Sequence, residues 1–504
     1  MSIATEIGQA DTITEGSRAH ELFVDRFELK RHFASYLNDD PPREQVLFLH
    51  GDGGNGKSLL LRHLREHYCK RLRPEHWQAL RAIPHAESVA HRVRQTDDAV
   101  QVPSVLLDFN MQPHGEDRPQ EAFSALLALR RGLAEHRIRF PLFDFGCVWY
   151  LQKTQQLTPE RLRDLFPAEE MDLIADIAHY LSERPLVLVA NSALGALSKH
   201  LRQRFALYMQ RRRLTRCQID AIEAMDEGEL LTHLPVLFAQ DLNAAVRKNR
   251  QHQRMVLFFD THEVLWGKER DFLDHMYFER DEWLRRLLTH LELTEGIVVV
   301  VAGRDRPRWA EAARFQIPDH YVDLHHVGHL PVAEGDRYLR LAGIDDHRLR
   351  QHLLTRAAVV PGQVHPLFLG LCADAVMGER PHATNTAGAH NDRIAARGRE
   401  VMDRLLRYVG AEVGYAVAAL SACAAFDRAI YFELGKQLGF QATEPAFVIL
   451  TKLSFVWPAK SHGPGWYRIH DLLHRLHHER GHDVTRRAAE VLKTLDLHGE
   501  ASAA

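Results

Sequence analysis

The segment from Val46 to Leu64 combines three features that few folds can accommodate. An apolar run, Val46-Leu47-Phe48-Leu49, precedes the glycine-rich stretch Gly51-Asp52-Gly53-Gly54-Asn55-Gly56-Lys57-Ser58, and a helical pattern follows over residues 59–64. Glycines let a loop turn its N–H groups toward an anion, and the helix that follows presents the positive end of its dipole to the same place. The segment therefore predicts a strand, a phosphate-binding loop and a helix.

The loop has the complete Walker A spacing, which gives each residue type an expected task. Lys57 is expected to reach the β- and γ-phosphates of a nucleotide, and Ser58 to bind Mg²⁺. We expect a nucleoside triphosphate or diphosphate with Mg²⁺ as the ligands, and Lys57 as a catalytic residue. A solvated lysine after a glycine-rich turn is the alternative, and the strand–loop–helix context argues against it. The candidate phosphate-binding residues are Gly51, Asp52, Gly53, Gly54, Asn55, Gly56, Lys57, Ser58 and Leu59.

Composition limits the class of protein. The chain has 504 residues, 45% of them hydrophobic and 26% charged, which is ordinary for a globular protein with two to four domains. A formal net charge of −3 disfavours a protein that coats polyanions. The five cysteines show no metal or disulfide spacing, and no stretch reaches 18 apolar residues. We expect a cytoplasmic protein without a membrane segment.

A second motif contains acidic residues and follows the strand-like run Met255-Val256-Leu257-Phe258-Phe259. Asp260 lies at its carboxyl end, where a Walker B aspartate holds Mg²⁺, and Glu263 lies close enough to polarise an attacking water as general base. The candidate metal ligands are therefore Ser58 and Asp260. An acidic strand end is common by itself, and its pairing with the Walker A loop makes it informative.

Further strand patterns complete a sheet. Runs at 105–109, 297–302 and 321–324 join those at 46–49 and 255–259, and helical patterns separate them. Five buried strands joined by helices predict an α/β fold with a five-stranded parallel sheet, whose ligand lies at the carboxyl ends of the strands. Arg304 follows the fourth run, where a cation would lie beside the γ-phosphate as a catalytic residue. A surface arginine is the alternative.

The predicted organisation has five parts. Residues 1–20 form a disordered tail, and 21–325 an NTPase domain with a helical insertion at about 151–250. A small helical domain and linker follow over 326–395. Residues 396–480 show helices and then a hairpin pattern around Gly463-Pro464-Gly465, as in a winged helix. A C-terminal helical tail occupies 481–504.

Two charged motifs have open interpretations. The insertion carries a basic stretch that suits an anionic partner or forms a solvated helix face: Lys199, Arg202, Arg204, Arg211, Arg212, Arg213 and Arg216. The series His478-Glu479-Arg480-Gly481-His482 has the spacing of a zinc peptidase motif. Gly481 weakens the helix that this motif needs, so a solvated helix end is the preferred interpretation.

Together these motifs resemble the STAND class of AAA+-like P-loop NTPases, which are signalling ATPases. The resemblance covers about 21–480. Leu22-Phe23-Val24-Asp25-Arg26 resembles the phenylalanine–valine–glycine–arginine motif that lines the adenine, with Asp25 in place of glycine. The resemblance implies that Val24 and Arg26 contact the base and that Arg304 acts as sensor 1.

Two more motifs match this class near the C-terminus. Gln363-Val364-His365-Pro366-Leu367 resembles the glycine–x–proline motif, of which only Pro366 carries over, as a nucleotide contact. Ile469-His470-Asp471 resembles the methionine–histidine–aspartate motif, which implies that His470 contacts the β-phosphate of ADP and latches a closed state. A histidine that merely ends a strand is the alternative.

Three functions compete. The first is an ADP-held switch that ATP opens, with slow hydrolysis, an effector or sensor protein in trans and an ATP-dependent homo-oligomer. The second is a DNA-handling ATPase that resembles origin-recognition or transposition loaders. For that function the winged-helix region is weakly charged, with nine Lys and Arg against seven Asp and Glu over 401–480. The third is a metabolic kinase or a peptidase.

Overall fold

The structure is a computed structural model of the whole chain. It describes residues 23–110, 118–156, 216–248, 254–266, 279–377, 397–398, 401–403, 405–406, 410–453, 455–459, 462–479 and 483–501. The predicted N-terminal tail, the linker over 381–395 and the basic stretch from Lys199 to Arg213 lie outside these ranges. Over the described residues, no helix is long and apolar enough to cross a membrane.

A five-stranded, all-parallel sheet forms the centre of the N-terminal part, as the sequence predicts. Its order is β4 (Ser104–Asp108), β5 (Met255–Asp260), β6 (Ile297–Gly303), β1 (Val46–His50) and β7 (Val322–His326). In the register, Asp108 lies opposite Asp260 and His50 lies opposite Gly303. The carboxyl ends of all five strands therefore meet at one edge, where the loop after β1 begins.

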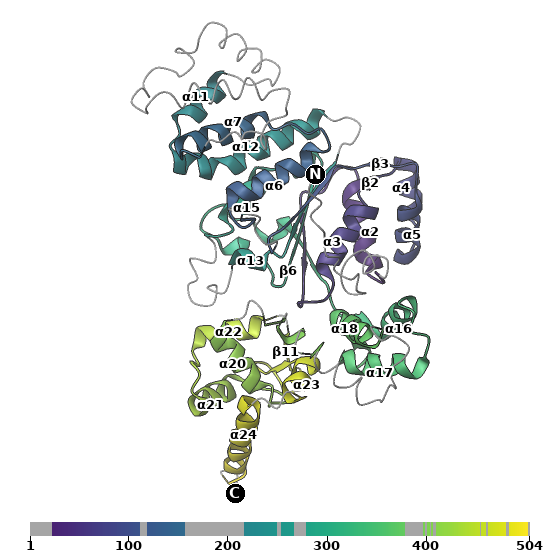
Figure 1. Ribbon diagram of the computed structural model, residues 1–504, viewed down its shortest axis with the longest axis vertical. Helices are drawn as coiled ribbons and strands as arrows, with labels where there is room; N and C mark the ends of the chain where they lie inside the picture. Colours follow the sequence, from purple (N-terminus) through teal and green to yellow (C-terminus); the bar gives the residue numbers. More distant parts are fainter. Residues whose placement is uncertain are drawn as a thin grey trace, which may run out of the picture.

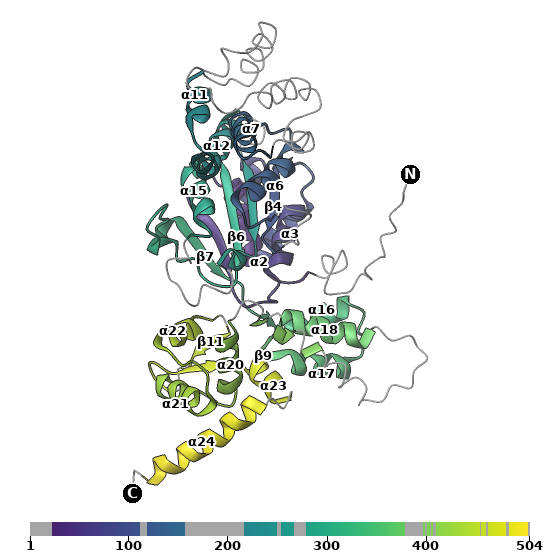
Figure 2. The same cartoon turned by 60° about the vertical axis from the view of Figure 1, so that its left-hand side comes forward.

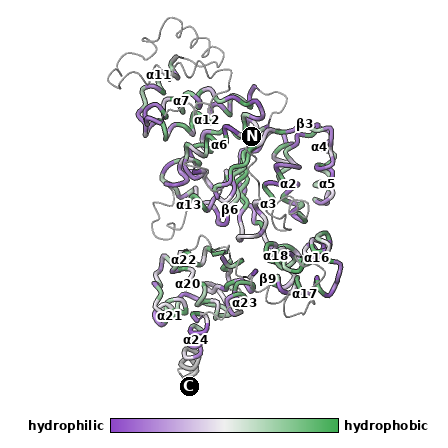
Figure 3. The backbone as a smooth tube through the Cα atoms, in the orientation of Figure 1, coloured by the Kyte–Doolittle hydropathy of each residue, from purple (hydrophilic) through white to green (hydrophobic). Residues whose placement is uncertain are grey.

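The sheet is covered on both faces, which explains its nearly continuous apolar strands. Val46 and Phe48 of β1 pack into one core, and Leu47 and Leu49 pack into another. The first core includes α6 (Ala122–Ala134), α7 (Pro141–Lys153), α12 (Glu227–Lys248) and α15 (Glu282–His290). The second includes α2 (Phe27–Asn38), α3 (Lys57–His67), α4 (Pro74–Arg81) and α5 (Ala86–Gln95). Figure 1 shows these layers, and Figure 3 shows the hydrophobic residues concentrated in the strands.

Smaller elements complete this part. The pair β2 (Lys70–Arg71) and β3 (Val100–Gln101) is antiparallel, and α13 (Glu263–Trp266) follows β5. Single 3₁₀ turns lie at η3 (Leu293–Glu295), η4 (Trp309–Glu311) and η5 (Asp319–Tyr321). The described residues of the predicted insertion are helical, in α7, α11 (Arg216–Ala224) and α12.

The C-terminal half is helical with short strands. It begins with β8 (Leu330–Pro331), α16 (Val332–Leu341), α17 (His347–Ala357), β9 (Ala358–Val360), β10 (Gln363–Val364) and α18 (Pro366–Met377). It continues with α20 (Ala411–Leu420), α21 (Arg428–Leu438), α22 (Glu444–Lys452), β11 (Val456–Pro458), β12 (Tyr467–Ile469), α23 (Asp471–Glu479) and α24 (Asp483–Ala501). Three helices followed by an antiparallel hairpin match the order of elements predicted for residues 399–480.

The first helical group, from β8 to α18, and the hairpin group, from α20 to α24, share one hydrophobic core. This core also contains Val24 from the N-terminal segment. Figures 1 and 2 show the groups side by side below the carboxyl edge of the sheet, with α24 projecting away from them. Arg475 of α23 donates hydrogen bonds to the carbonyls of Arg356 and Ala358, at 2.7 and 3.0 Å. The hairpin group and the first helical group are thereby held together under the loop that follows β1.

Candidate functional site

The loop from Gly51 to Gly56 has a backbone that requires glycine. Gly51, Gly54 and Gly56 have φ angles of 148°, 86° and 84°, and α3 begins at the next residue, Lys57. At Gly54, a Cβ would lie 2.7 Å from Cε1 of His365 and 2.9 Å from Cβ of Leu367. The amide of Leu367 also donates to the carbonyl of Gly54, at 3.2 Å. The segment that begins α18 is therefore seated directly on the glycine loop.

Lys57 is buried inside this loop. Its Nζ donates to the carbonyls of Gly51 and Asp52, at 2.6 and 2.8 Å. Burial lowers the pKa of the ammonium, while the nearby Glu263 carboxylate opposes that change. The ammonium thus lies at the centre of the loop, where a phosphate oxygen would replace carbonyl groups as its partner.

Asp260 is the last residue of β5, and its carboxyl group is buried. Its Oδ1 accepts a hydrogen bond from the Thr261 amide at 2.8 Å, whereas Oδ2 finds no hydrogen-bond partner among the described residues. Burial, followed by the charge of Asp108, raises the Asp260 pKa to about 7, and the nearby Ser58 hydroxyl opposes the rise. Buried carboxylates with unmet oxygens are suited to a cation. Asp260, with the hydroxyl of Ser58, could hold a Mg²⁺ ion at this edge of the sheet.

Glu263 and Arg304 form a two-point ion pair. Oε1 of Glu263 accepts from Nε of Arg304 at 3.0 Å, and Oε2 accepts from the Arg304 amide at 3.1 Å. The same guanidinium donates through Nη1 to the carbonyl of Leu405, at 2.7 Å. It also approaches the glycine loop, because a Cβ on Gly53 would lie 3.0 Å from its Cζ. Both oxygens of the predicted general base are thus engaged by the predicted sensor.

His470 follows β12 and is completely buried. Its Nδ1 accepts a hydrogen bond from the Leu473 amide at 3.1 Å, so the ring proton lies on Nε2. Burial lowers the pKa of His470 to about 4, so the ring is neutral at physiological pH. In the part of the chain that the structure describes, Nε2 has no hydrogen-bond partner. The ring therefore carries one buried, unused donor.

Two further histidines, which the sequence motifs did not identify as site residues, surround the loop. Nε2 of His329 lies 3.2 Å from Oδ2 of Asp52, and the His329 ring is 5.5 Å from that of His365 and 6.1 Å from that of His470. Nε2 of His365 lies 3.1 Å from the carbonyl of Gly53. All three rings are buried, and burial lowers the pKa of His365 well below its usual value. Histidines from three separate segments thus meet at Asp52.

The residues expected to line the adenine lie at the same junction. Val24 is buried in the C-terminal core, and Arg26 donates to the Asn55 carbonyl at 3.2 Å and to the Gly328 carbonyl. Pro366 is the first residue of α18, beside the segment that contacts Gly54. The structure therefore brings every predicted site residue to the carboxyl edge of the sheet or to the helices below it.

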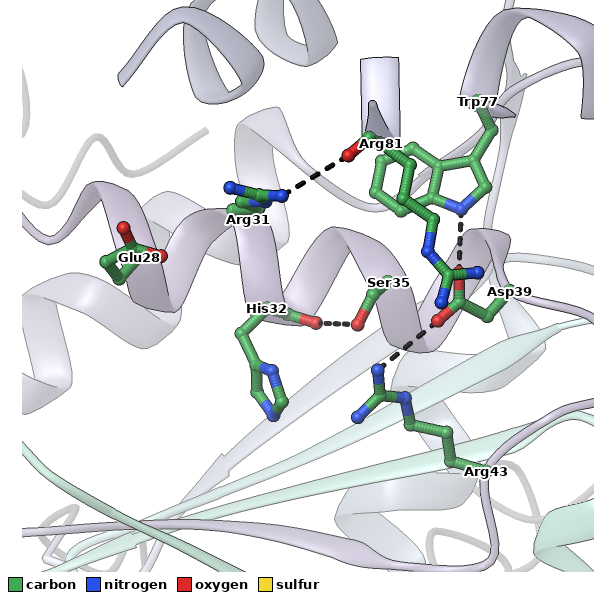
Figure 4. A pocket seen from close by; sticks show the side chains of 8 residues that line it. All are labelled: Glu28, Arg31, His32, Ser35, Asp39, Arg43, Trp77 and Arg81. Atoms are coloured by element: carbon green, nitrogen blue, oxygen red, sulfur yellow. Dashed lines mark hydrogen bonds and ion pairs between the residues drawn. The ribbon is translucent and has the colours of Figure 1, made fainter. Parts of the chain in front are cut away.

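Two other features lie away from this junction. His478, from the zinc-peptidase spacing, is exposed near the end of α23, and Arg480 to His482 are outside the described residues. A cavity of about 220 Å³ lies along α2, and Figure 4 shows Arg43, Trp77 and Arg81 directed toward Asp39 beside it. Neither feature contacts the glycine loop.

A Walker A loop between a buried parallel strand and a helix gives this chain the arrangement of a P-loop NTPase. No family model matches the chain, and no curated protein matches it. The Walker-type ATPase of Pyrococcus abyssi is similar, with 11% identity and a TM-score of 0.47 over 93% of this chain and 99% of that one. The Orc1 protein of Aeropyrum pernix, solved in complex with DNA, has 12% identity and a TM-score of 0.34 over 93% and 95%. At this similarity neither protein identifies what this chain binds.

Proposed function

We propose that this chain is an ATP- and ADP-binding switch of the STAND type, held closed by ADP. The observation that carries the proposal is the unused Nε2 donor of His470, buried near the Asp52 end of the glycine loop. An unsatisfied buried donor costs roughly 1–3 kcal/mol. A phosphate oxygen of bound ADP would accept that hydrogen bond and connect the sheet to the winged helix.

The loop and strand residues would hold the nucleotide. Lys57 would neutralise phosphate charge, and Ser58 with Asp260 would bind Mg²⁺, which stabilises negative charge on the phosphates. Val24, Arg26 and Pro366 would contact the nucleoside side of the site. These tasks agree with the burial and unmet oxygen of Asp260 and with the central position of the Lys57 ammonium.

Hydrolysis by this closed form would be slow. Glu263 is the group that would polarise water, yet both its oxygens accept hydrogen bonds from Arg304. Arg304 is itself bound to the Leu405 carbonyl in the C-terminal half. Opening would release Arg304 from Leu405, so that the guanidinium turns toward a γ-phosphate and the carboxylate is freed. The closed arrangement thereby couples low activity to the position of the winged helix.

The test compares two histidines of the same region. His470→Ala should lose ADP that co-purifies with the parent and weaken ADP affinity by about 10-fold or more, because one charge-assisted hydrogen bond contributes roughly 1.5–3 kcal/mol. His478→Ala, at the exposed end of α23, should bind ADP like the parent. Lys57→Ala should bind neither nucleotide. Calorimetric titration measures all three, and parental ADP affinity in folded His470→Ala would refute the latch.

DNA handling remains the second candidate for the winged helix. The helix before the hairpin, α22, carries one glutamate and one lysine, so it has no net charge with which to track phosphates. We expect no salt-dependent binding of duplex DNA by the full chain at low ionic strength. Such binding would favour the DNA-handling function over the switch.

A further inference from the structure

A group of metal-ligand side chains lies between α2 and β7, at the border of the cavity. His32 comes from α2, and Asp323 and His325 come from β7. Residues two apart in a strand point to the same face, so Asp323 and His325 both face the helix that carries His32. One ligand atom from each of the three residues lies within 4.8 Å of the other two.

The carboxylate of Asp323 is the centre of this group. Its Oδ2 lies 2.6 Å from Nε2 of His32, and its Oδ1 lies 2.9 Å from Nε2 of His325. Tyr36, one turn after His32, donates its hydroxyl to Oδ2 at 2.7 Å. Burial alone would raise the pKa of Asp323, but the hydrogen bonds from His32, His325 and Tyr36 hold it well below its usual range. The hydrogen bonds from these three side chains therefore already orient the carboxylate.

We propose that His32, Asp323 and His325 form a binding site for a divalent first-row transition ion, with Zn²⁺ as the reference ion. Two imidazole nitrogens and one carboxylate oxygen are a ligand set that Zn²⁺ takes with a water in the remaining position. The Tyr36 hydroxyl is the outer partner that commonly orients a ligating carboxylate.

The hydrogen-bonded group would rearrange to bind a metal ion. Zinc–nitrogen and zinc–oxygen distances of about 2.0–2.2 Å place tetrahedral ligand pairs about 3.3–3.5 Å apart. The nitrogen–oxygen pairs at 2.6 and 2.9 Å involve different oxygens of Asp323. Both pairs would open, and the three ligand atoms, which now lie within 4.8 Å of one another, would gather around one ion. Nε2 of each ring would bind the ion, with the ring proton on Nδ1.

The site is accessible to an ion from solvent. The side chains of His32, Asp323 and His325 are 25%, 19% and 30% exposed. Figure 4 shows the His32 ring hanging from α2 at the border of the cavity, directed toward the strands rather than toward Arg43. Partial exposure leaves room for the water that completes the coordination of the metal.

An ion here would connect two segments that reach the glycine loop. Arg26, just before α2, donates to the carbonyls of Asn55 and Gly328. At the end of β7, the Val327 amide donates to His50, and Asn55 donates to the Val327 carbonyl at 3.0 Å. Metal bound between α2 and β7 would therefore cross-link the two segments and stabilise the folded chain.

The test uses the full chain freed of metal by a chelator, without nucleotide. Addition of Co²⁺ should give the visible absorption of a four- or five-coordinate site that saturates at about one ion per chain, and Zn²⁺ should displace it. Zn²⁺ should also raise the melting temperature. His325→Gln and Asp323→Asn should lose both effects, while Tyr36→Phe should weaken the affinity by about 10-fold.

Three controls separate this site from the other histidines and from the nucleotide site. His320→Gln changes an exposed histidine near β7, His478→Gln changes the exposed end of α23, and Asp260→Asn changes the predicted Mg²⁺ ligand. All three should keep the cobalt absorption. Circular dichroism of the metal-free variants establishes that they fold. The proposal is overturned if the parent gives no such absorption, or if folded His325→Gln gives the parent's spectrum.

Discussion

A single backbone hydrogen bond determines what His470 can do. Because Leu473 donates its amide to Nδ1, only Nε2 can carry the proton of the neutral ring. Burial lowers the pKa to about 4, so this assignment holds throughout the physiological pH range. His470 therefore presents a neutral donor rather than a titrating cation, and its contribution to nucleotide binding should not change between pH 6 and pH 8.

At the same scale, we predict that Asp260→Asn stabilises the nucleotide-free protein at pH 8. The Asp260 pKa rises from 3.8 to about 7 on folding, mainly because of burial. Between pH 3.8 and about pH 7, the folded state keeps a proton on Asp260 that the unfolded state has released. The free energy of unfolding therefore falls as pH rises through this window. A shift of about three units corresponds to up to about 4 kcal/mol, which asparagine would recover.

Urea unfolding at two pH values tests this prediction. The stabilising effect of Asp260→Asn should be about 2–4 kcal/mol at pH 8 and should shrink to about 1–2 kcal/mol at pH 5, where the folded parent is protonated. Asp319→Asn, at an exposed aspartate, should show no such dependence. Equal stability of Asp260→Asn and the parent at pH 8 would contradict the assigned cause. The variant should also lose Mg²⁺-dependent nucleotide binding.

At the scale of elements, the sequence predicts the strands and most helices closely. The run at 255–259 became β5, Met255–Asp260, and the helical pattern over 59–64 lies within α3, Lys57–His67. Fully buried parallel strands have continuous apolar sequences, and helices have a distinct period, so both signals are local. Helix α2 begins at Phe27, directly after Asp25 and Arg26, whose positive φ angles of 64° and 62° are not helical.

Contacts between distant elements could not be predicted in the same way. His329 lies outside every motif, and the motif that contains His365 pointed only to Pro366. Only the folded chain places the two histidines near Asp52. The Glu263–Arg304 pair joins the ends of β5 and β6, and its partner Leu405 lies 101 residues beyond Arg304. Sequence spacing locates residues along one element, whereas these contacts depend on how separate elements pack.

The contact between the glycine loop and α18 gives a prediction for Gly54→Ala. Gly54 has φ 86°, and a Cβ there would collide with His365 and Leu367. Gly439, which ends α21, has φ 81° and no atom within 4 Å of an added Cβ, so it is a matched control. We expect Gly439→Ala to lower the free energy of unfolding by about 1–2 kcal/mol, the cost of the left-handed backbone alone.

Gly54→Ala should cost about 2–5 kcal/mol, because overpacking adds roughly 1–3 kcal/mol to the same backbone cost. Chemical denaturation of both variants measures the difference. Gly54→Ala should also weaken nucleotide binding, since the loop and the start of α18 must move apart, while Gly439→Ala should bind normally. If the two variants were equally stable, the segment from His365 to Leu367 would not rest on the loop.

At the scale of the whole molecule, three separate parts of the chain converge on one loop. The loop itself provides Asp52. The three parts are the segment between β7 and β8, which provides His329, and the two C-terminal groups, which provide His365 and His470. Arg304 adds a fourth connection, from the sheet to Leu405. Because the contacts between these segments lie close together, a ligand that replaces a few of them can shift the equilibrium between closed and open arrangements.

The proposed switch therefore predicts that two variants in the same ATP solution differ in radius of gyration and mass. Glu263→Gln keeps Lys57, Ser58 and Asp260, so it should bind ATP with Mg²⁺ while hydrolysis falls about a hundredfold or more. Trapped ATP should release the Leu405 contact of Arg304 and populate an open or oligomeric form, seen as a larger radius of gyration and mass in solution scattering. Lys57→Ala in the same ATP solution should keep the parent's closed dimensions. An unchanged radius and mass for ATP-saturated Glu263→Gln would mean that nucleotide exchange does not open this molecule.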